Sequence, residues 1–155
     1  MRVCKHQIIW GGNYFDLPHT GSWIVWDKGI YADCSFADGE LAWTSFDSVM
    51  RIAQVRYKGF LGADTIRIHP TQKPVALYAW LLRNYAHPGD RIFDPMMGSQ
   101  SSRIAAYKMG FDYVGCELDK EYFEKGCDRF NRECKGETIS KDGSIIKQLR
   151  LFENE

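Results

Sequence analysis

Residues 91–119 read RIFDPMMGSQSSRIAAYKMGFDYVGCELD, and this stretch decides the fold. A β-branched and aromatic run ends at Asp94 and is followed by a loop of small residues. A short helix then ends at Gly110, and a second apolar run covers 113–116. This order of strand, turn, helix and strand predicts one βαβ unit and therefore an α/β protein.

The loop of this unit is rich in small residues. Residues 98–102 are Gly-Ser-Gln-Ser-Ser, and they would place backbone N–H groups at the N-terminus of the predicted helix. The partial positive charge there favours an anionic group such as a carboxylate or a phosphate. Glu117 closes the second strand, where an acid in nucleotide-binding α/β units accepts hydrogen bonds from ribose hydroxyls. The stretch is therefore typical of a site for a nucleoside with a charged tail.

Length and composition favour one compact domain with a single core, since the chain has 155 residues of which 45% are hydrophobic. The formal net charge is zero, so contact with DNA would need a local basic patch. The five cysteines lack the spacing of a zinc site, which indicates free thiols and no bound metal. No apolar run reaches membrane-spanning length and no signal peptide is recognised, so we expect a cytoplasmic protein.

Three short strands are predicted in the first third of the chain. The first covers 7–10 and runs into a Gly-Gly-Asn turn. The second covers 22–26, and the third covers 41–46 after the turn signal Asp38-Gly39. We expect the second and third strands to pair as an antiparallel hairpin.

A local basic patch follows these strands. Residues 51–73 carry five basic side chains against the single acid Asp64, with aromatic residues interleaved. Such a segment is either a solvated loop or a surface that contacts DNA, and the sequence leaves both interpretations open. The predicted DNA-binding residues, in a segment that covers 51–68, are Arg51, Arg56, Tyr57, Lys58, Phe60 and Arg67.

Two further helices flank the βαβ unit. One begins near Pro74 and ends near Tyr85, with leucines on its inner face. The other is capped by Asp119 and continues to about residue 134, with its charged residues on the face opposite an apolar stripe. That stripe indicates core packing rather than a metal site, and it consists of Phe123, Cys127, Phe130 and Cys134.

Three motifs occur in a specific order: HPTQKP at 69–74, FDPMMGSQ at 93–100 and VGCELD at 114–119. In this order they resemble the signature of DNA amino-methyltransferases, enzymes that use S-adenosyl-L-methionine (AdoMet) to methylate N6 of adenine or N4 of cytosine. The resemblance is to the circularly permuted group, and especially to small phage and prophage adenine methyltransferases. It implies a Rossmann-like methyltransferase fold over residues 1–134, with a mixed sheet that includes the antiparallel hairpin, followed by a tail over 135–155.

The resemblance also implies which residues bind AdoMet. Asp94 would contact the methionine amino group, and Glu117 would accept bonds from the ribose hydroxyls. Gln100 stands where the family usually has Gly, so either Gln is strained there at positive φ or its amide contacts the ligand. The full implied AdoMet-binding set is Thr71, Lys73, Asp94, Pro95, Gly98, Ser99, Gln100 and Glu117.

The catalytic loop of the family, an Asp, Asn or Ser followed by Pro-Pro and an aromatic residue, does not occur in the sequence. In the permuted order it belongs before the strand at 7–10, so we expect a C-terminal portion of the family fold that lacks one or more N-terminal strands. The Asp-Leu-Pro-His turn at 16–19 is a poor substitute, because it follows another strand and lacks the Pro-Pro-aromatic pattern. If the chain is active, the Asn13 side chain would accept a hydrogen bond from the target amine, and the Tyr14 ring would stack on the flipped base.

Two functions are therefore compatible with the sequence. The first is a site-specific DNA (adenine-N6) methyltransferase acting on double-stranded DNA. The second is a module that binds AdoMet or DNA without turnover, or a subunit completed by another chain. A generic NAD-binding fold is disfavoured, because FDPMMGSQ lacks the G-x-G-x-x-G spacing.

The tail contains a candidate docking peptide. Residues 148–152, QLRLF, resemble the QLxLF peptide by which bacterial and phage DNA enzymes dock on the sliding clamp. The polar run 135–144 would act as a flexible tether. The alternative is a C-terminal helix that packs on the domain, because Ile145, Ile146, Leu149 and Phe152 also fall at helical spacing. The residues predicted to contact the clamp are Gln148, Leu149, Leu151 and Phe152.

Overall fold

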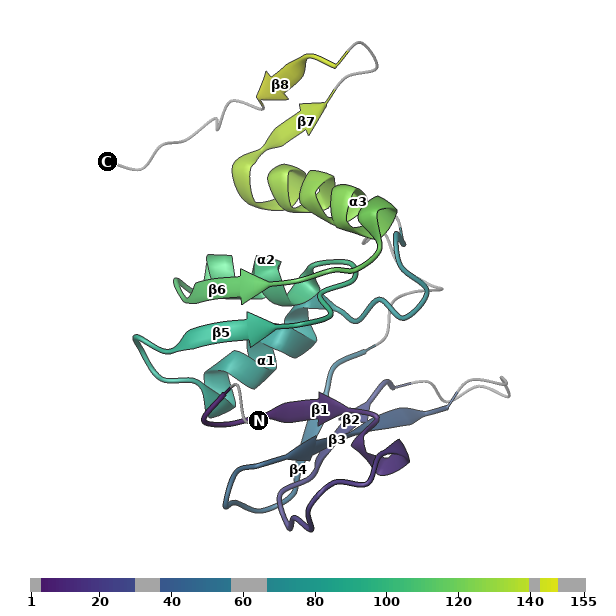
Figure 1. The fold of residues 1–155 in the computed structure, drawn as a ribbon, viewed down its shortest axis with the longest axis vertical. Coiled ribbons are helices and arrows are strands. Elements are labelled where there is room, and N and C mark those ends of the chain that lie inside the picture. The colour runs from purple at the N-terminus through teal and green to yellow at the C-terminus, as the bar shows by residue number, and fades with distance from the viewer. Residues whose placement is uncertain (1–3, 30–36, 57–66, 140–142, 148–155) are drawn as a thin grey trace. The chain divides into compact units, whose positions relative to one another are not determined.

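The computed structural model describes residues 4–29, 37–56, 67–139 and 143–147 of the chain (Figure 1). Contacts within the chain divide it into two compact units, residues 1–64 and 65–155. No helix in the described ranges is long and apolar enough to cross a membrane.

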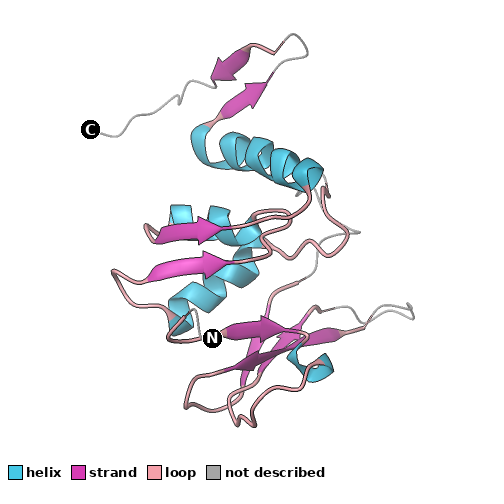
Figure 2. Cartoon of the chain, in the orientation of Figure 1, coloured by secondary structure: helices cyan, strands magenta, loops and turns pink. Residues whose placement is uncertain are grey.

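The first unit is a four-stranded mixed sheet in the order β1-β3-β2-β4, and Figure 2 draws its strands as magenta arrows. β3 pairs antiparallel with both β1 and β2, whereas β4 pairs parallel with β2. The predicted hairpin of the second and third strands is therefore confirmed. The bounds of the strands are Ile8–Trp10 for β1, Ile24–Asp27 for β2, Gly39–Thr44 for β3 and Arg51–Gln54 for β4.

The strand β4 was not predicted from the sequence. Only Ala53 of its four residues is buried, while Arg51, Ile52 and Gln54 are exposed. The segment therefore has the polar composition of a loop although it hydrogen-bonds along β2. Its pairing with a strand that lies far back in the chain makes it a strand, and local sequence carries no sign of that partner.

Two tryptophans form the polar anchors of this unit. Trp26 is 1% exposed and its Nε1 donates to the Val55 carbonyl at 2.6 Å. The Nε1 of Trp43 donates to the Pro18 carbonyl at 2.7 Å. A buried indole N–H needs an acceptor, so these bonds attach the segment after β4 and the turn at 16–19 to the sheet. The turn at 16–19 thus has a structural role.

The second unit contains the βαβ unit predicted from residues 91–119. β5 covers Arg91–Asp94, α2 covers Ser101–Lys108 and β6 covers Asp112–Gly115. β5 and β6 pair in parallel with Asp94 opposite Gly115. The prediction of one βαβ unit is therefore confirmed.

Two helices cover one face of the β5–β6 pair (Figure 1). α1 covers Val75–Tyr85, and the leucines predicted for its inner face, Leu77, Leu81 and Leu82, are all buried. Leu82 of α1 packs with Ala105 and Ala106 of α2. The small alanines let the two helices approach closely over the apolar side chains of the strands.

α3 covers Lys120–Phe130 and continues into a single π-helical turn, Asn131–Lys135. Asp119 caps it as predicted, because its Oδ1 accepts the Tyr122 N–H at 2.9 Å. Two details of the predicted faces are wrong. Phe123, expected in the core, is 42% exposed, and Arg129, expected on the charged outer face, is 2% exposed.

The C-terminal segment folds into a small hairpin. β7, Glu137–Ile139, pairs antiparallel with β8, Ile145–Lys147. The expected flexible tether is therefore wrong at 137–139, which form a strand, and the expected helix at Ile145 and Ile146 is wrong as well. β-branched residues favour strands, and Gly143 supplies a positive φ of 86° in the connection. The predicted clamp-binding residues 148–152 lie outside the described residues.

The cysteines agree with the expected thiol state. Cys4, Cys116, Cys127 and Cys134 are all free, and Cys34 lies outside the described residues. Burial raises the pKa of the Cys134 thiol, which keeps it protonated and unreactive in the core beside Phe130.

Candidate functional site

Two carboxylates stand at the same edge of the β5–β6 pair. Asp94 is the last residue of β5, and Glu117 follows β6 after one intervening residue. Because the two strands are parallel, their carboxyl ends meet at one edge, beside the loop that leads into α2 (Figure 1). In open α/β sheets, ligands bind outside the carboxyl ends of the strands.

Asp94 is held by two hydrogen bonds, one on each oxygen. Its Oδ1 accepts the Met96 N–H at 3.1 Å, and its Oδ2 accepts the Ser102 hydroxyl at 2.6 Å. The side chain is half-buried, and Pro95 directly after it is exposed. A carboxylate has about four acceptor positions, so Asp94 keeps capacity for a cationic group of a ligand.

Glu117 contacts the loop directly. Its Oε2 accepts the Gly98 N–H at 2.7 Å, and its Oε1 accepts the Asp119 N–H at 3.0 Å. These bonds to a carboxylate are charge-assisted. They fix the orientation of the Glu117 side chain and hold the loop at Gly98 against it. The structure thus brings together two residues that the sequence placed in one site.

The loop itself approaches the HPTQKP turn closely. Gly98 has a φ of 46°, and a Cβ at this position would lie 3.4 Å from the His69 ring. α2 begins at Ser101 without a side-chain cap. The first-turn N–H groups of a helix have no partner within it, so this helix end offers donors to an anionic group.

Gln100 settles the two alternatives that its sequence position left open. It is the only non-glycine among the described residues with a positive φ, at 60°. Its side chain is fully buried, with Nε2 donating to the Phe123 carbonyl at 3.0 Å and Oε1 accepting from Arg103 at 2.8 Å. The first alternative therefore holds, and the amide binds protein rather than facing the site.

The HPTQKP turn is held together by its own polar groups. The Thr71 hydroxyl lies 3.1 Å from His69 Nδ1, and the His69 ring packs edge-on to Tyr122 at 4.4 Å between centroids. Arg67 donates to the carbonyls of His69 and Pro70. Arg67, which was predicted to contact DNA, thus also stabilises this turn by its hydrogen bonds to the backbone. Lys73, at the end of the turn, is half-buried.

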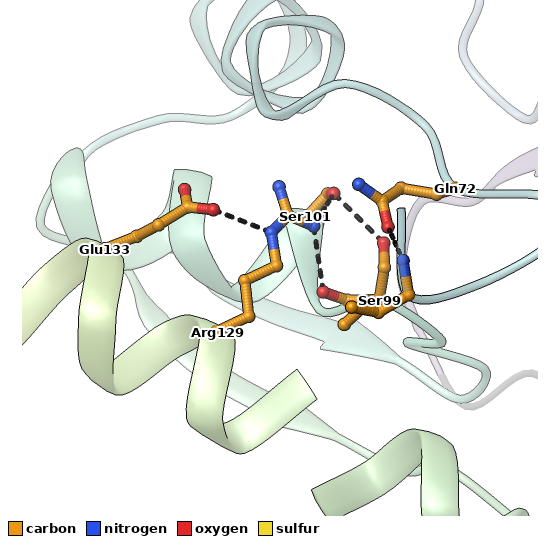
Figure 3. Close-up of polar contacts among 6 residues, drawn as sticks. Gln72, Ser99, Ser101, Arg129 and Glu133 are labelled. Carbon is orange, nitrogen blue, oxygen red and sulfur yellow. Dashed lines mark hydrogen bonds and ion pairs between the residues drawn. The ribbon is translucent and has the colours of Figure 1, made fainter. Parts of the chain in front are cut away.

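Arg129 is a site residue that sequence reasoning missed. Its Nη1 donates to the Ser99 carbonyl at 3.0 Å and to the Ser101 hydroxyl at 2.8 Å, and its Nε donates to Glu133 at 2.7 Å (Figure 3). This buried guanidinium supports the loop from the side of α3. The i,i+4 spacing of Arg129 and Glu133 was visible in the sequence, but such pairs are usually solvated.

Ser102 and Tyr113 were missed as well. The Tyr113 hydroxyl lies 2.9 Å from the Ser102 hydroxyl, which in turn bonds to Asp94. Burial, followed by the nearby Asp94 charge, raises the pKa of Tyr113 well above its usual range. No sequence motif indicates this contact, because it joins a strand residue to a helix residue across the βαβ unit.

The remaining predicted residues of the first unit that the structure describes are exposed. Asn13 and Tyr14 lie on a single 3₁₀ turn, Gly12–Tyr14, and Tyr14 is 84% exposed. Arg51 lies on β4, and Arg56 follows it with its Cγ 3.1 Å from the point where a Cβ at Gly29 would lie. The other predicted DNA-binding residues, Tyr57, Lys58 and Phe60, lie outside the described residues.

The chain is similar to known proteins over most of its length. It is 32% identical over 97 residues to the DNA adenine methyltransferase YhdJ of Escherichia coli strain K12, which covers 58% of this chain and 33% of YhdJ. It is 40% identical over 63 residues to YubD of the same organism, which covers 41% of this chain and 28% of YubD. The chain thus spans about a third of the length of the curated relatives it matches.

The fold is shared with a solved structure. The crystal structure of the M1.HpyAVI–SAM complex matches with a TM-score of 0.54 and 24% identity, over 71% of this chain and 60% of that chain. The α/β fold with a mixed sheet, which the sequence predicted, is therefore shared with that structure. The family model N6_N4_Mtase, DNA methylase, matches residues 9–127, and the chain belongs to this DNA methylase family.

Proposed function

We propose that this chain binds AdoMet and takes part in the transfer of its methyl group to N6 of adenine in double-stranded DNA. The observation that carries the proposal is the placement of Asp94 and Glu117 at the adjacent ends of β5 and β6, with Glu117 bonded to the Gly98 N–H. The SAM complex of M1.HpyAVI and the adenine specificity in the name of YhdJ support it.

The residues of the site fit the groups of AdoMet. The spare acceptor positions of Asp94 suit the methionine ammonium, and Glu117 suits the ribose hydroxyls. The uncapped start of α2 suits the methionine carboxylate, with Thr71 and Lys73 nearby on the turn that packs against Gly98. Pro95, Gly98 and Ser99 would line the part of the loop where AdoMet comes close to the backbone. AdoMet supplies an electrophilic methyl group when bound.

The DNA side of the proposal rests on other residues. The sequence contains no Pro-Pro-aromatic loop, so within residues 1–155 the candidates for the target amine and the flipped base are Asn13 and Tyr14. Phosphate contacts would come from the 51–68 segment, of which Arg51 and Arg56 are exposed. With double-stranded DNA as its substrate, the protein would act in the cytoplasm of a bacterial or phage-infected host cell.

A second candidate function is binding of AdoMet and DNA without turnover, or turnover only with another chain. It is favoured by one observation, the absence of the Pro-Pro-aromatic motif from residues 1–155. Positioning the target amine in line with the methyl group is worth several powers of ten in rate. Under this alternative the purified chain binds AdoMet but transfers methyl very slowly.

Two measurements test the proposal in sequence. Isothermal calorimetry with AdoMet and purified, folded protein is expected to show saturable binding, and absence of a binding heat contradicts the proposal. Incubation with labelled AdoMet and duplex DNA, followed by mass spectrometry of the nucleosides, then separates the functions. N6-methyladenine supports the enzyme, N4-methylcytosine corrects the base, and binding without transfer supports the second candidate.

The docking peptide belongs to the same proposal as a partner contact. Gln148, Leu149, Leu151 and Phe152 would engage a bacterial sliding clamp, with the leucine and phenylalanine side chains in an apolar cleft. A peptide of residues 144–155 is expected to bind the clamp in about the micromolar range. Loss of binding on replacing Leu151 and Phe152 by Ala supports the contact, and a peptide that never binds contradicts it.

A further inference from the structure

Three polar groups form one chain of hydrogen bonds behind the Asp94 carboxylate. The Ser102 hydroxyl lies 2.6 Å from Asp94 Oδ2 and 2.9 Å from the Tyr113 hydroxyl. A serine hydroxyl donates one proton, and an ionised carboxylate only accepts. Ser102 therefore donates to Asp94, and Tyr113 donates to Ser102, so the direction of both bonds follows from the chemistry.

The surroundings keep this chain intact. Burial and the Asp94 charge raise the pKa of Tyr113, so its hydroxyl keeps its proton at neutral pH. Ser102 is 6% exposed, so little water competes for its hydroxyl. Position 115 leaves the space for the phenol, because a Cβ there would lie 2.7 Å from the Tyr113 hydroxyl oxygen. Linked donors polarise one another, which strengthens the bond that reaches the carboxylate.

The two bonds on Asp94 fix its plane. Oδ1 is held by the Met96 N–H and Oδ2 by Ser102, so the carboxylate cannot rotate without losing a bond. Each oxygen keeps an acceptor position for a ligand. Removing the Ser102 hydroxyl leaves Asp94 held on one oxygen, and the carboxylate must then be ordered again each time a ligand binds.

We propose that Ser102 and Tyr113 are positioning residues, which orient the Asp94 carboxylate toward the methionine ammonium of AdoMet. The inference rests on the proposed function, because it assigns a role within the same AdoMet site. Ser102 acts directly on Asp94, and Tyr113 acts only through Ser102. Both residues act on Asp94, whereas the nucleoside half of the ligand would be held by Glu117.

A purely structural role for this chain makes a different prediction. If the bonds only attach α2 to the strands, their loss loosens the loop and weakens every ligand of the site. A positioning role weakens only ligands that carry the ammonium. The nucleoside 5′-methylthioadenosine lacks the amino-acid end of AdoMet and therefore separates the two roles.

The experiment measures the affinity of the purified chain for AdoMet and for 5′-methylthioadenosine by calorimetry, with thermal unfolding as a check on folding. Ser102→Ala is expected to weaken AdoMet binding about tenfold or more, because it removes a bond to a charged group. Tyr113→Phe, which removes only an oxygen, is expected to weaken it about threefold. The double variant should be no worse than Ser102→Ala alone, because Tyr113 works through Ser102.

The control is Tyr107→Phe, the same change on an exposed side chain of α2, and it should leave both affinities unchanged. Affinity for 5′-methylthioadenosine should stay within about twofold in all variants, and this pattern supports the proposal. Equal losses for both ligands, unchanged AdoMet affinity in Ser102→Ala, or additive losses in the double variant overturn it. Absence of AdoMet binding by the unaltered chain overturns the proposed function itself.

Discussion

At the scale of single residues, the site depends on where charge is placed relative to the strands. Asp94 and Asp112 stand at opposite ends of the same two-stranded pair, Asp94 at the carboxyl end of β5 and Asp112 at the amino end of β6. Only the first end faces the loop and the start of α2. Both aspartates belong to the same pair of strands, so their different positions along the strands decide which of them can bind a ligand.

This difference gives a matched pair of variants. Asp94→Ala is expected to weaken AdoMet binding by about 1–3 kcal/mol, because a charge-assisted bond to the ammonium is lost. Asp112→Ala, at the exposed opposite edge, should leave the affinity unchanged. Calorimetry at one salt concentration measures both. Similar affinities for the two variants would remove Asp94 from the site.

At the scale of elements, α2 and α3 are joined by buried polar side chains rather than by apolar packing alone. Gln100 at the start of α2 reaches the Phe123 carbonyl, and Arg129 of α3 reaches back to the Ser99 carbonyl. The two contacts run in opposite directions between the same elements. They tie the ligand-facing loop to a helix that continues well beyond the site.

The Gln100 contact requires a glycine in the middle of α3. A Cβ at Gly126 would lie 2.6 Å from the Gln100 side chain, and the three nearest atoms all belong to Gln100. In an ordinary helix Gly→Ala stabilises by about 0.5–1 kcal/mol. Gly126→Ala should instead lower the free energy of unfolding, because the new methyl group displaces a buried amide.

Gln100→Gly is the matched background for this change. There the clash is gone, so Gly126→Ala should regain its ordinary stabilising sign. Urea denaturation of the four proteins measures the reversal. The same sign in both backgrounds would show that Gln100 does not set the need for glycine.

The Arg129 contact carries a larger expected effect. Arg129→Met leaves Glu133 without its buried partner and the Ser99 carbonyl without its donor. Glu133 keeps 22% of its side chain in solvent, so the expected loss is about 2–4 kcal/mol, below that of a fully buried pair. Urea denaturation checks it against Arg132→Met, a change at the exposed neighbouring position. Equal stabilities of the two variants would contradict the role of Arg129.

At the scale of the whole molecule, net charge is zero and the basic side chains are local. The proposed binding to DNA would therefore depend on a few phosphate contacts rather than on a general field. Some basic residues already interact with groups of the protein itself. Arg129 is buried, and Arg67 donates to a carbonyl of the HPTQKP turn. Of the predicted DNA-binding residues in the described ranges, Arg51 and Arg56 remain, and both are exposed, which suits contact with phosphate.

Salt dependence measures these contacts. Replacing Arg51 and Arg56 together by Gln should weaken DNA binding at low salt and flatten the plot of log affinity against log salt by about two units, one for each phosphate. The control is Arg83→Gln, an exposed arginine in the last turn of α1. Fluorescence anisotropy with a labelled duplex gives both slopes. An unchanged slope would show that Arg51 and Arg56 do not contact phosphate and that the segment is an ordinary protein surface.

Local patterns in the sequence determined the elements that depend on neighbours along the chain. The βαβ unit, α1 with its three leucines, the Asp119 cap and the hairpin of β2 and β3 all follow from periodicity, capping and turn residues within short windows. The order of three motifs also indicated the DNA methylase family and assigned Glu117 and the glycine loop to one predicted site.

Tertiary structure alone decided the features that depend on distant partners. β4 is a strand because β2 lies beside it, and the segments 137–139 and 145–147 form a hairpin because they pair with each other. Arg129 is buried, and Tyr113 reaches Ser102, because elements far apart in the chain meet there. A sequence pattern records which face of an element is apolar, whereas the partner that a polar side chain meets on that face is set only by packing.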